Sequence, residues 1–78
     1  MPTVFQIDGY RFFFYSSDIA EPIHIHVEKG GATAKFWISP LRLQKSRGFS
    51  NPEINRIIKH VEKNHNLIVR CWNEFFND

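Results

Sequence analysis

The sequence predicts an α+β fold: an antiparallel sheet of four to five strands, packed on one face against one long amphipathic C-terminal helix. Two observations lead to this prediction. Turn signals at Asp8-Gly9 and Gly30-Gly31 each join two runs rich in β-branched and aromatic residues. A capping pattern at Ser50 then opens a stretch with helical spacing. Because 78 residues suffice for one small domain, we expect residues 1–78 to form a single domain.

The strands are expected as two hairpins and a short edge strand. Each hairpin closes through residues that tolerate positive φ. The polar segment Ser16–Pro22, which ends in proline, is expected to be a loop. Proline is tolerated at a sheet edge, so a short strand can follow Pro40. The expected strands are Thr3–Ile7, Tyr10–Tyr15, Ile23–Glu28, Ala32–Ile38 and Leu41–Gln44.

The helix begins with a capping box, since Ser50 and Glu53 have the S-x-x-E spacing and Pro52 lies in the first turn. Residues at spacings of three and four then form one stripe. The segment Lys63–Asn66 contains weak helix formers, but the stripe keeps its phase across it, so one continuous helix is expected. The stripe consists of Ile54, Ile58, Val61, His65, Ile68, Trp72 and Phe75.

The segment "EPIHIHVEKGG" raises the main functional question. Side chains alternate along a strand, so Ile23, Ile25 and Val27 face the helix and the intervening residues face away from it. The same alternation in neighbouring strands predicts a polar and aromatic face that no helix covers. Its expected members are His24, His26, Glu28, Lys35, Trp37 and Arg42, joined by Arg11, Phe13 and Tyr15 if the second strand pairs in phase.

Two histidines at positions i and i+2 lie roughly 7 Å apart on one face of a strand, so their rings can converge. Near neutral pH one imidazole can act as a base and the other as an acid. Beside basic and aromatic residues, the matching chemistry is RNA cleavage without a metal. His24 and His26 are therefore the candidate catalytic residues. Trp37, Phe13 or Tyr15 could stack a base, and the phosphate-binding candidates are Arg11, Lys35, Arg42 and Arg47.

Two other roles for the histidine pair stay open. Imidazole is a common zinc ligand, so His24 and His26 could bind zinc with Glu28 as a third ligand. No cofactor is expected otherwise. The histidines could also be structural, with each ring hydrogen-bonded to a carboxylate or a carbonyl.

Charge and aromatic content bear on partners. The formal net charge is only +2, but residues 29–52 carry five basic residues and no acidic one. This segment is either a solvated rim or a patch for phosphate or an acidic partner. The run Phe12, Phe13, Phe14 and Tyr15 either fills the core of a short chain or forms an interface with a partner protein or a second copy in a homo-oligomer.

The remaining signals concern location. Cys71 is the only cysteine, which fits a reducing compartment, and its place near the stripe favours a structural thiol. No segment has the pattern of a signal peptide or of a membrane span. We therefore expect a cytoplasmic protein that does not bind membranes.

Several segments together resemble the prokaryotic domain of unknown function DUF4160: "MPTVFQIDGYRFFFYSSD", "EPIHIHVEKG", "AKFWI", "RGFS" and "CWNEFF". The resemblance covers nearly the whole chain, with Ile23 standing where such sequences often have a second proline. It implies a small cytoplasmic prokaryotic protein of a kind that is often encoded beside a DUF2442-type partner. No activity comes with the resemblance, and it gives His24 and His26 no catalytic role.

The sequence and the resemblance together favour one member of a two-gene toxin–antitoxin-like module that acts on RNA through the His-x-His strand. If it is an enzyme, a metal-independent ribonuclease is expected. Two alternatives remain: a non-enzymatic partner-binding or regulatory module, and a zinc-binding protein that uses the histidine pair.

Overall fold

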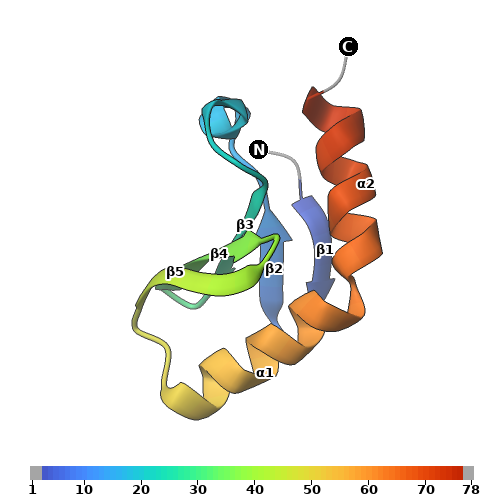
Figure 1. The fold of residues 1–78 in the computed structure, drawn as a ribbon. Helices are drawn as coiled ribbons and strands as arrows, with labels where there is room; N and C mark the ends of the chain where they lie inside the picture. The colour runs from blue at the N-terminus through green and yellow to red at the C-terminus, as the bar shows by residue number, and fades with distance from the viewer. Residues whose placement is uncertain (1–2, 77–78) are drawn as a thin grey trace.

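The computed structural model describes residues 3–76, which form an α+β fold with one five-stranded sheet. Every neighbouring pair of strands is antiparallel, and the strands lie side by side in chain order (Figure 1). The elements are β1 (Thr3–Ile7), β2 (Tyr10–Phe13), a 3₁₀ helix η1 (Ser16–Ala20), β3 (His24–Lys29), β4 (Ala32–Ile38), β5 (Leu41–Arg47), α1 (Asn51–Lys63) and α2 (His65–Phe76).

Both predicted hairpin turns are confirmed. Asp8 and Gly9 have φ values of 54° and 84°, and Gly30 and Gly31 have φ values of 61° and 117°. Positive φ at both central positions gives the turn a twist that matches the flanking strands. The last strand is longer than expected: β5 continues to Arg47. Its pairing with β4 contains a bulge beside Lys35. Most of β5 is exposed, as befits an edge strand.

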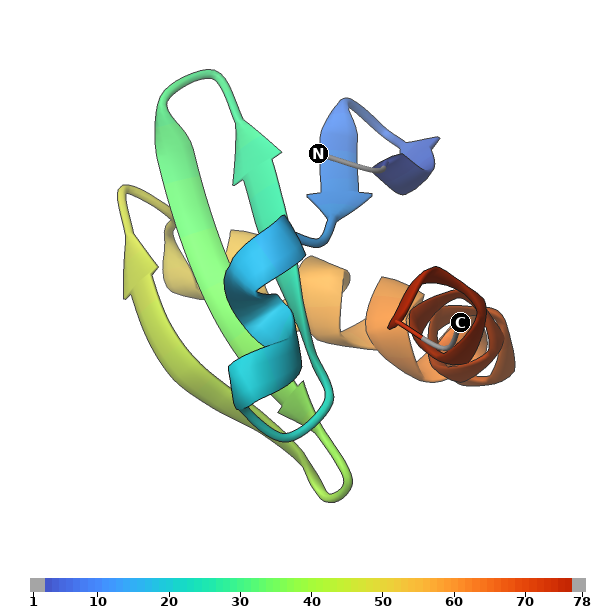
Figure 2. The ribbon, with the colours of Figure 1, turned by 90° about the horizontal axis from the view of Figure 1, so that it is seen from above.

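The predicted loop Ser16–Pro22 contains the short helix η1. The backbone N–H of Tyr15 donates a hydrogen bond to the Asp18 carboxylate at 2.8 Å, and the N–H of Asp18 donates to the carbonyl of Tyr15 at 3.0 Å. These two bonds close the turn and direct Asp18 inward. Figure 2 shows η1 on the face of the sheet opposite to α1. The face that no helix was expected to cover is therefore partly covered by η1.

The other face carries the hydrophobic core, as the alternation predicts. Phe12 on β2, Ile25 on β3 and Phe36 on β4 are fully buried against side chains of α1 and α2. The helices contribute four buried side chains to this core: Ile57, Val61, Ile68 and Trp72. One side of the sheet thus provides most of the apolar area that stabilises the fold.

Three of the four residues suggested as a partner interface are buried by this chain itself. Phe12, Phe13 and Phe14 are at most 2% exposed, so they follow the core alternative and offer no surface to a partner. Tyr15 is 42% exposed. Their burial follows from the sheet, since Phe12 and Phe14 face the helices while Phe13 packs on the opposite face.

The prediction of one long C-terminal helix is wrong, because the helix breaks at Asn64 into α1 and α2. The Asn64 backbone has φ −108° and ψ 20°, and its side-chain amide donates to the carbonyl of His60 at 2.9 Å. Such a local bond competes with the helical ladder. The chain bends here, and the two helices point in different directions (Figure 1). The capping box of Ser50 and Glu53 is confirmed.

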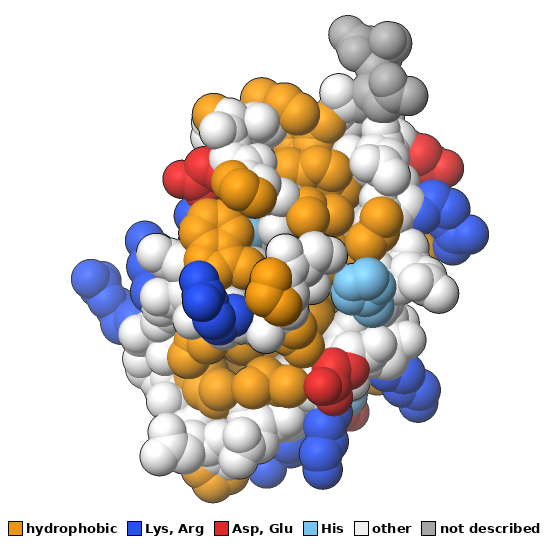
Figure 3. All heavy atoms as spheres, viewed as in Figure 1, with side chains coloured by type: hydrophobic (Ala, Val, Ile, Leu, Met, Phe, Trp, Pro, Cys, Tyr) orange, Lys and Arg blue, Asp and Glu red, His pale blue; other side chains and the backbone are white. Residues whose placement is uncertain are grey.

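The bend places α2 near the end of the sheet that carries η1. The ring of Trp72 on α2 lies 5.2 Å from that of Phe14 and 5.3 Å from that of His24. Figure 3 shows hydrophobic side chains gathered between η1 and α2 on the face in view. Ile19 on η1 and Phe75 on α2 are the most exposed large hydrophobic residues described, at 57% and 43%. Within residues 3–76, no helix has the length and apolarity needed to span a membrane.

Candidate functional site

The strand register confirms which residues share the polar face. His26 lies opposite Phe13 on β2 and opposite Lys35 on β4, while His24 lies opposite Trp37. Residues directly opposite each other in a sheet point to the same face. The pairing continues to β5, where Lys45 lies opposite Lys35. The polar face is therefore assembled much as the alternation predicts.

His24 is not exposed on this face, which corrects the expectation. Its side chain has no exposed surface. The rings of Trp37 and Trp72 pack edge-on against it at 5.6 and 5.3 Å. Its Nδ1 lies 2.8 Å from the carbonyl oxygen of Pro22. A carbonyl can only accept a hydrogen bond, so the Nδ1 of His24 carries a hydrogen and donates it.

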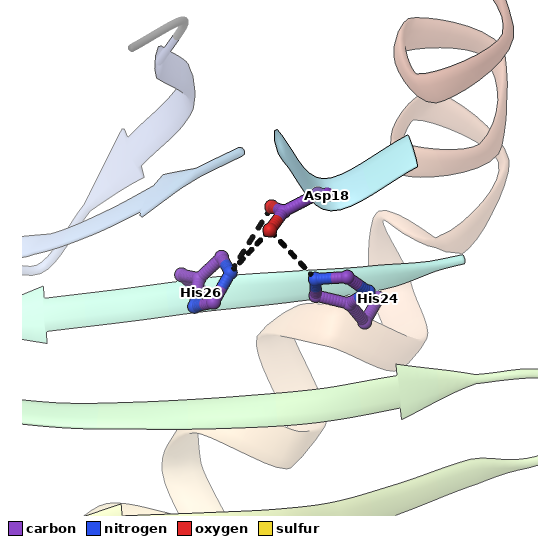
Figure 4. Close-up of side chains that lie close together, drawn as sticks. All are labelled: Asp18, His24 and His26. Atoms are coloured by element: carbon purple, nitrogen blue, oxygen red, sulfur yellow. Dashed lines mark hydrogen bonds and ion pairs between the residues drawn. The ribbon is translucent and has the colours of Figure 1, made fainter. Parts of the chain in front are cut away.

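Asp18 of η1 is the side chain that joins the two histidines (Figure 4). Its Oδ1 lies 3.1 Å from the Nε2 of His24, and its Oδ2 lies 3.0 Å from the Nε2 of His26. Asp18 is only 8% exposed. The sequence reasoning missed this residue because it treated Ser16–Pro22 as a polar loop. An acidic residue in a short loop leading directly into a His-x-His strand was the available signal.

The electrostatics of the cluster favour a charged carboxylate beside a neutral ring. Burial alone raises the pKa of Asp18, but the hydrogen bonds that its carboxylate accepts from the backbone N–H of Tyr15 and from His26 outweigh burial, and the pKa is lowered from 3.8. Burial lowers the pKa of His26 below 6.5, and the contact with Asp18 offsets this only in part. Near neutral pH Asp18 is therefore an anion and His26 is a neutral imidazole.

Glu28, suggested as a third metal ligand, lies outside this cluster. Its carboxylate pairs with the Arg11 guanidinium at 2.7 Å. Among the described residues, the side chains that could hold a metal ion together are Asp18, His24 and His26, whose ligand atoms all lie within 4.8 Å of one another. The carboxylate beside the histidine pair comes from η1 rather than from the strand.

A hollow of about 450 Å³ opens beside His26. Its walls include the rings of Phe13 and Tyr15, with Lys45 and Arg47 of β5. Lys45 and Arg47 are exposed, and the structure gives neither an ion pair with a described residue. Lys35 also lines the hollow, but it pairs with Glu21 at 2.5 Å. The hollow therefore offers two uncompensated cations, one accessible aromatic ring and one histidine.

The other predicted ligand-binding residues lie elsewhere on the same face. Trp37 and Arg42 line a separate hollow of about 220 Å³. Arg11 lines a third hollow. Its guanidinium pairs with the carboxylate of Glu28 and lies 4.2 Å from the centre of the Phe13 ring. The structure thus brings Lys35 and Arg47 together with His26 around one hollow, whereas Trp37, Arg42 and Arg11 line other hollows. Trp37 still adjoins the first hollow, since the Nζ of Lys35 lies 4.8 Å from the centre of its ring.

Comparison with known families agrees with the resemblance seen in the sequence. Residues 9–73 match the family model described as "Domain of unknown function (DUF4160)". The chain belongs to the DUF4160 family. The match spans Asp18, both histidines and the basic residues of β5, so the whole candidate site lies inside the DUF4160 domain. No curated protein and no solved structure matches the chain.

Proposed function

We propose that this DUF4160 protein binds single-stranded RNA in the hollow beside His26, as the RNA-acting member of a two-gene toxin–antitoxin-like module. One observation carries the proposal. The hollow combines the cations Lys45 and Arg47 with the exposed ring of Tyr15 on one side of the sheet. Lysine and arginine attract the phosphate backbone, and an accessible aromatic ring stacks on a base.

The shape of the hollow supports a single strand over a duplex. Its volume of about 450 Å³ lies within the range of small-ligand pockets, so it can receive a nucleotide that is not base-paired. Phe13 is 2% exposed, with Arg11 and His26 over its ring, so it leaves the stacking role to Tyr15. The cations of β5 lie at an open sheet edge, where an extended backbone can pass.

His24 cannot take part in proton transfer with RNA, because its side chain has no exposed surface. The shared acid and base roles suggested for the two histidines therefore reduce to His26, which borders the hollow. The proposal is accordingly RNA binding, and cleavage is an additional outcome to score in the same assay.

The test uses fluorescence anisotropy with a short labelled single-stranded RNA. In Lys45→Ala/Arg47→Ala we expect affinity to fall about tenfold and the salt slope to become shallower by about 1.4, since each phosphate contact contributes about 0.7. The matched control is Lys59→Ala/Lys63→Ala, which removes the same charge from exposed positions of α1. Equal losses in the two variants would mean that net charge alone drives binding, and no binding by the parent would refute the proposal.

The toxin–antitoxin part of the proposal has its own test. Expression of the chain alone should arrest bacterial growth, and co-expression of a DUF2442-type protein should restore it. The exposed Ile19 and Phe75 are the surface we propose for that partner. Ile19→Ser should then weaken co-purification with the partner and leave RNA binding unchanged. Normal growth on expression of the folded chain would refute the toxin role.

A further inference from the structure

His24 presents an unusual buried group. Its Nδ1 hydrogen is taken by the carbonyl of Pro22, so in a neutral ring its Nε2 carries a lone pair. Within the described part of the chain, this Nε2 is completely buried and has no hydrogen-bond partner. The nearest charged atom is the Oδ1 of Asp18 at 3.1 Å, but the two atoms are not aligned for a hydrogen bond. A buried acceptor that faces a carboxylate is unfavourable unless a hydrogen or a cation lies between them.

The neighbouring atoms complete a set of ligands. The Nε2 of His26 lies 3.0 and 3.3 Å from the two carboxylate oxygens of Asp18. Two imidazole nitrogens and one carboxylate oxygen within 4.8 Å of one another match the donors that bind zinc and related divalent ions. Small movements of the side chains would bring all three to bonding distance, since Zn–N and Zn–O bonds are about 2.0–2.2 Å long.

Outer hydrogen bonds fix the orientation of these ligands, as they do in known metal sites. A ligating histidine usually donates its other ring N–H to a carbonyl or carboxylate, which fixes its tautomer and orientation. The Nδ1–H of His24 donates to Pro22 in this way. The carboxylate of Asp18 is held in turn by the backbone N–H of Tyr15 at 2.8 Å. Trp37 and Trp72 pack against His24 and exclude water from its buried side.

We propose that Asp18, His24 and His26 form a binding site for a divalent transition-metal ion, and Zn²⁺ is the first ion to test. Three protein ligands leave a fourth position open in a tetrahedral site. His26 is also the ligand of this set that borders the hollow described above. The metal site does not depend on RNA binding.

A second histidine–aspartate pair provides a matched control. The Nε2 of His60 lies 3.1 Å from the Oδ2 of Asp8, a distance close to those in the cluster. This pair has no third ligand within the described residues, and its Asp8 side chain is 67% exposed. A His60→Asn variant therefore removes a histidine–carboxylate contact without touching the proposed site. Cys71→Ser serves as a second control for zinc bound at the thiol.

The experiment measures Zn²⁺ binding to the untagged full-length chain by isothermal titration calorimetry, after the chain has been stripped of metal with a chelator. We expect one Zn²⁺ per chain and a rise in melting temperature that grows with zinc concentration. Asp18→Asn and His26→Asn should each weaken binding at least about 100-fold, while His60→Asn and Cys71→Ser should stay within about twofold of the parent. Cobalt(II) should give a visible absorption band that both site variants lose.

Two results would overturn the proposal. One is a metal-free chain that binds no Zn²⁺ and melts identically with zinc and with EDTA. The other is stoichiometric binding that survives in folded Asp18→Asn and His26→Asn but is lost in one of the controls. Zinc binding by the Lys45→Ala/Arg47→Ala variant should match the parent, so failure of the RNA proposal and failure of the metal proposal are distinguishable.

Discussion

The two faces of the sheet are stabilised in different ways. The face under α1 and α2 buries apolar side chains such as Ile25 and Phe36 against the helices. The opposite face is partly covered by η1, with Trp72 of α2 against His24, and its buried groups Asp18 and His24 are held by a few directed polar contacts. Because side chains alternate, adjacent residues on β3 belong to different faces. Substitutions at two adjacent positions of β3 should therefore have different effects: one changes the hydrophobic core, and the other changes the candidate site.

The largest expected effect is on the helix-covered face. Phe36→Ala removes a fully buried ring between β4 and the helices and should lower the free energy of unfolding by about 3–5 kcal/mol. Urea denaturation followed by circular dichroism measures this loss. For so small a domain such a loss approaches the total stability, so Phe36→Leu serves as the folded, milder variant. A loss under about 1 kcal/mol for Phe36→Ala would contradict the view that burial on this face provides most of the stability.

The next effect is on the polar face. In the metal-free protein, Asp18→Asn should lower the free energy of unfolding by about 2 kcal/mol, because a buried charged acceptor of several hydrogen bonds is replaced by a neutral one. Urea titrations in EDTA give this value. The control is Asp8→Asn, which alters the exposed pair with His60 and should cost less than about 0.5 kcal/mol. Similar losses for the two variants would mean that burial adds nothing to the cluster.

A smaller effect is expected at Glu28, where sequence and structure suggest different roles. Glu28→Gln breaks the partly exposed pair with Arg11 and should cost less than about 1 kcal/mol in urea denaturation. It should leave Zn²⁺ affinity unchanged, because the carboxylate lies outside the proposed ligand set. A clear loss of zinc binding would restore Glu28 as the third ligand in place of Asp18.

The smallest effect concerns the start of α1. The backbone N–H of Ser50 donates to Glu53 and lowers the pKa of Glu53 from 4.5. A lowered pKa in the folded state stabilises the protein above the unfolded pKa, and this contribution is lost as the pH falls through the folded value. Urea midpoints measured from about pH 6 to about pH 3 should thus fall less steeply in Glu53→Gln than in the parent. Parallel curves would show that this carboxylate has no role in acid stability.

The sequence predicted well those features that depend on local periodicity. The bounds of β1 and β4 were correct, since alternation and the glycine turns define them. It failed at Asn64, where a local side-chain bond breaks a helix whose apolar stripe keeps its phase. Periodicity indicates which face is buried, but it does not reveal a bend that preserves that face.

The candidate site was predicted only in part. Alternation placed His24 and His26 together, but it could not show that η1 and Trp72 cover His24. Asp18 joins the site through tertiary structure, because the turn closed by Tyr15 folds back over β3. Pairing between strands can be inferred from turns, whereas the position of a short loop helix above a sheet depends on contacts that have no sequence period.

The bend at Asn64 also has a consequence for the site. It directs α2 so that Trp72 packs against His24, a residue of β3 that is distant from both helices along the chain. A straight C-terminal helix would carry this tryptophan along the axis of α1 and away from η1. Water could then reach the imidazole of His24 and compete for its Nε2. The angle between the two helices therefore controls the hydration of the site, although neither helix contributes a polar atom to it.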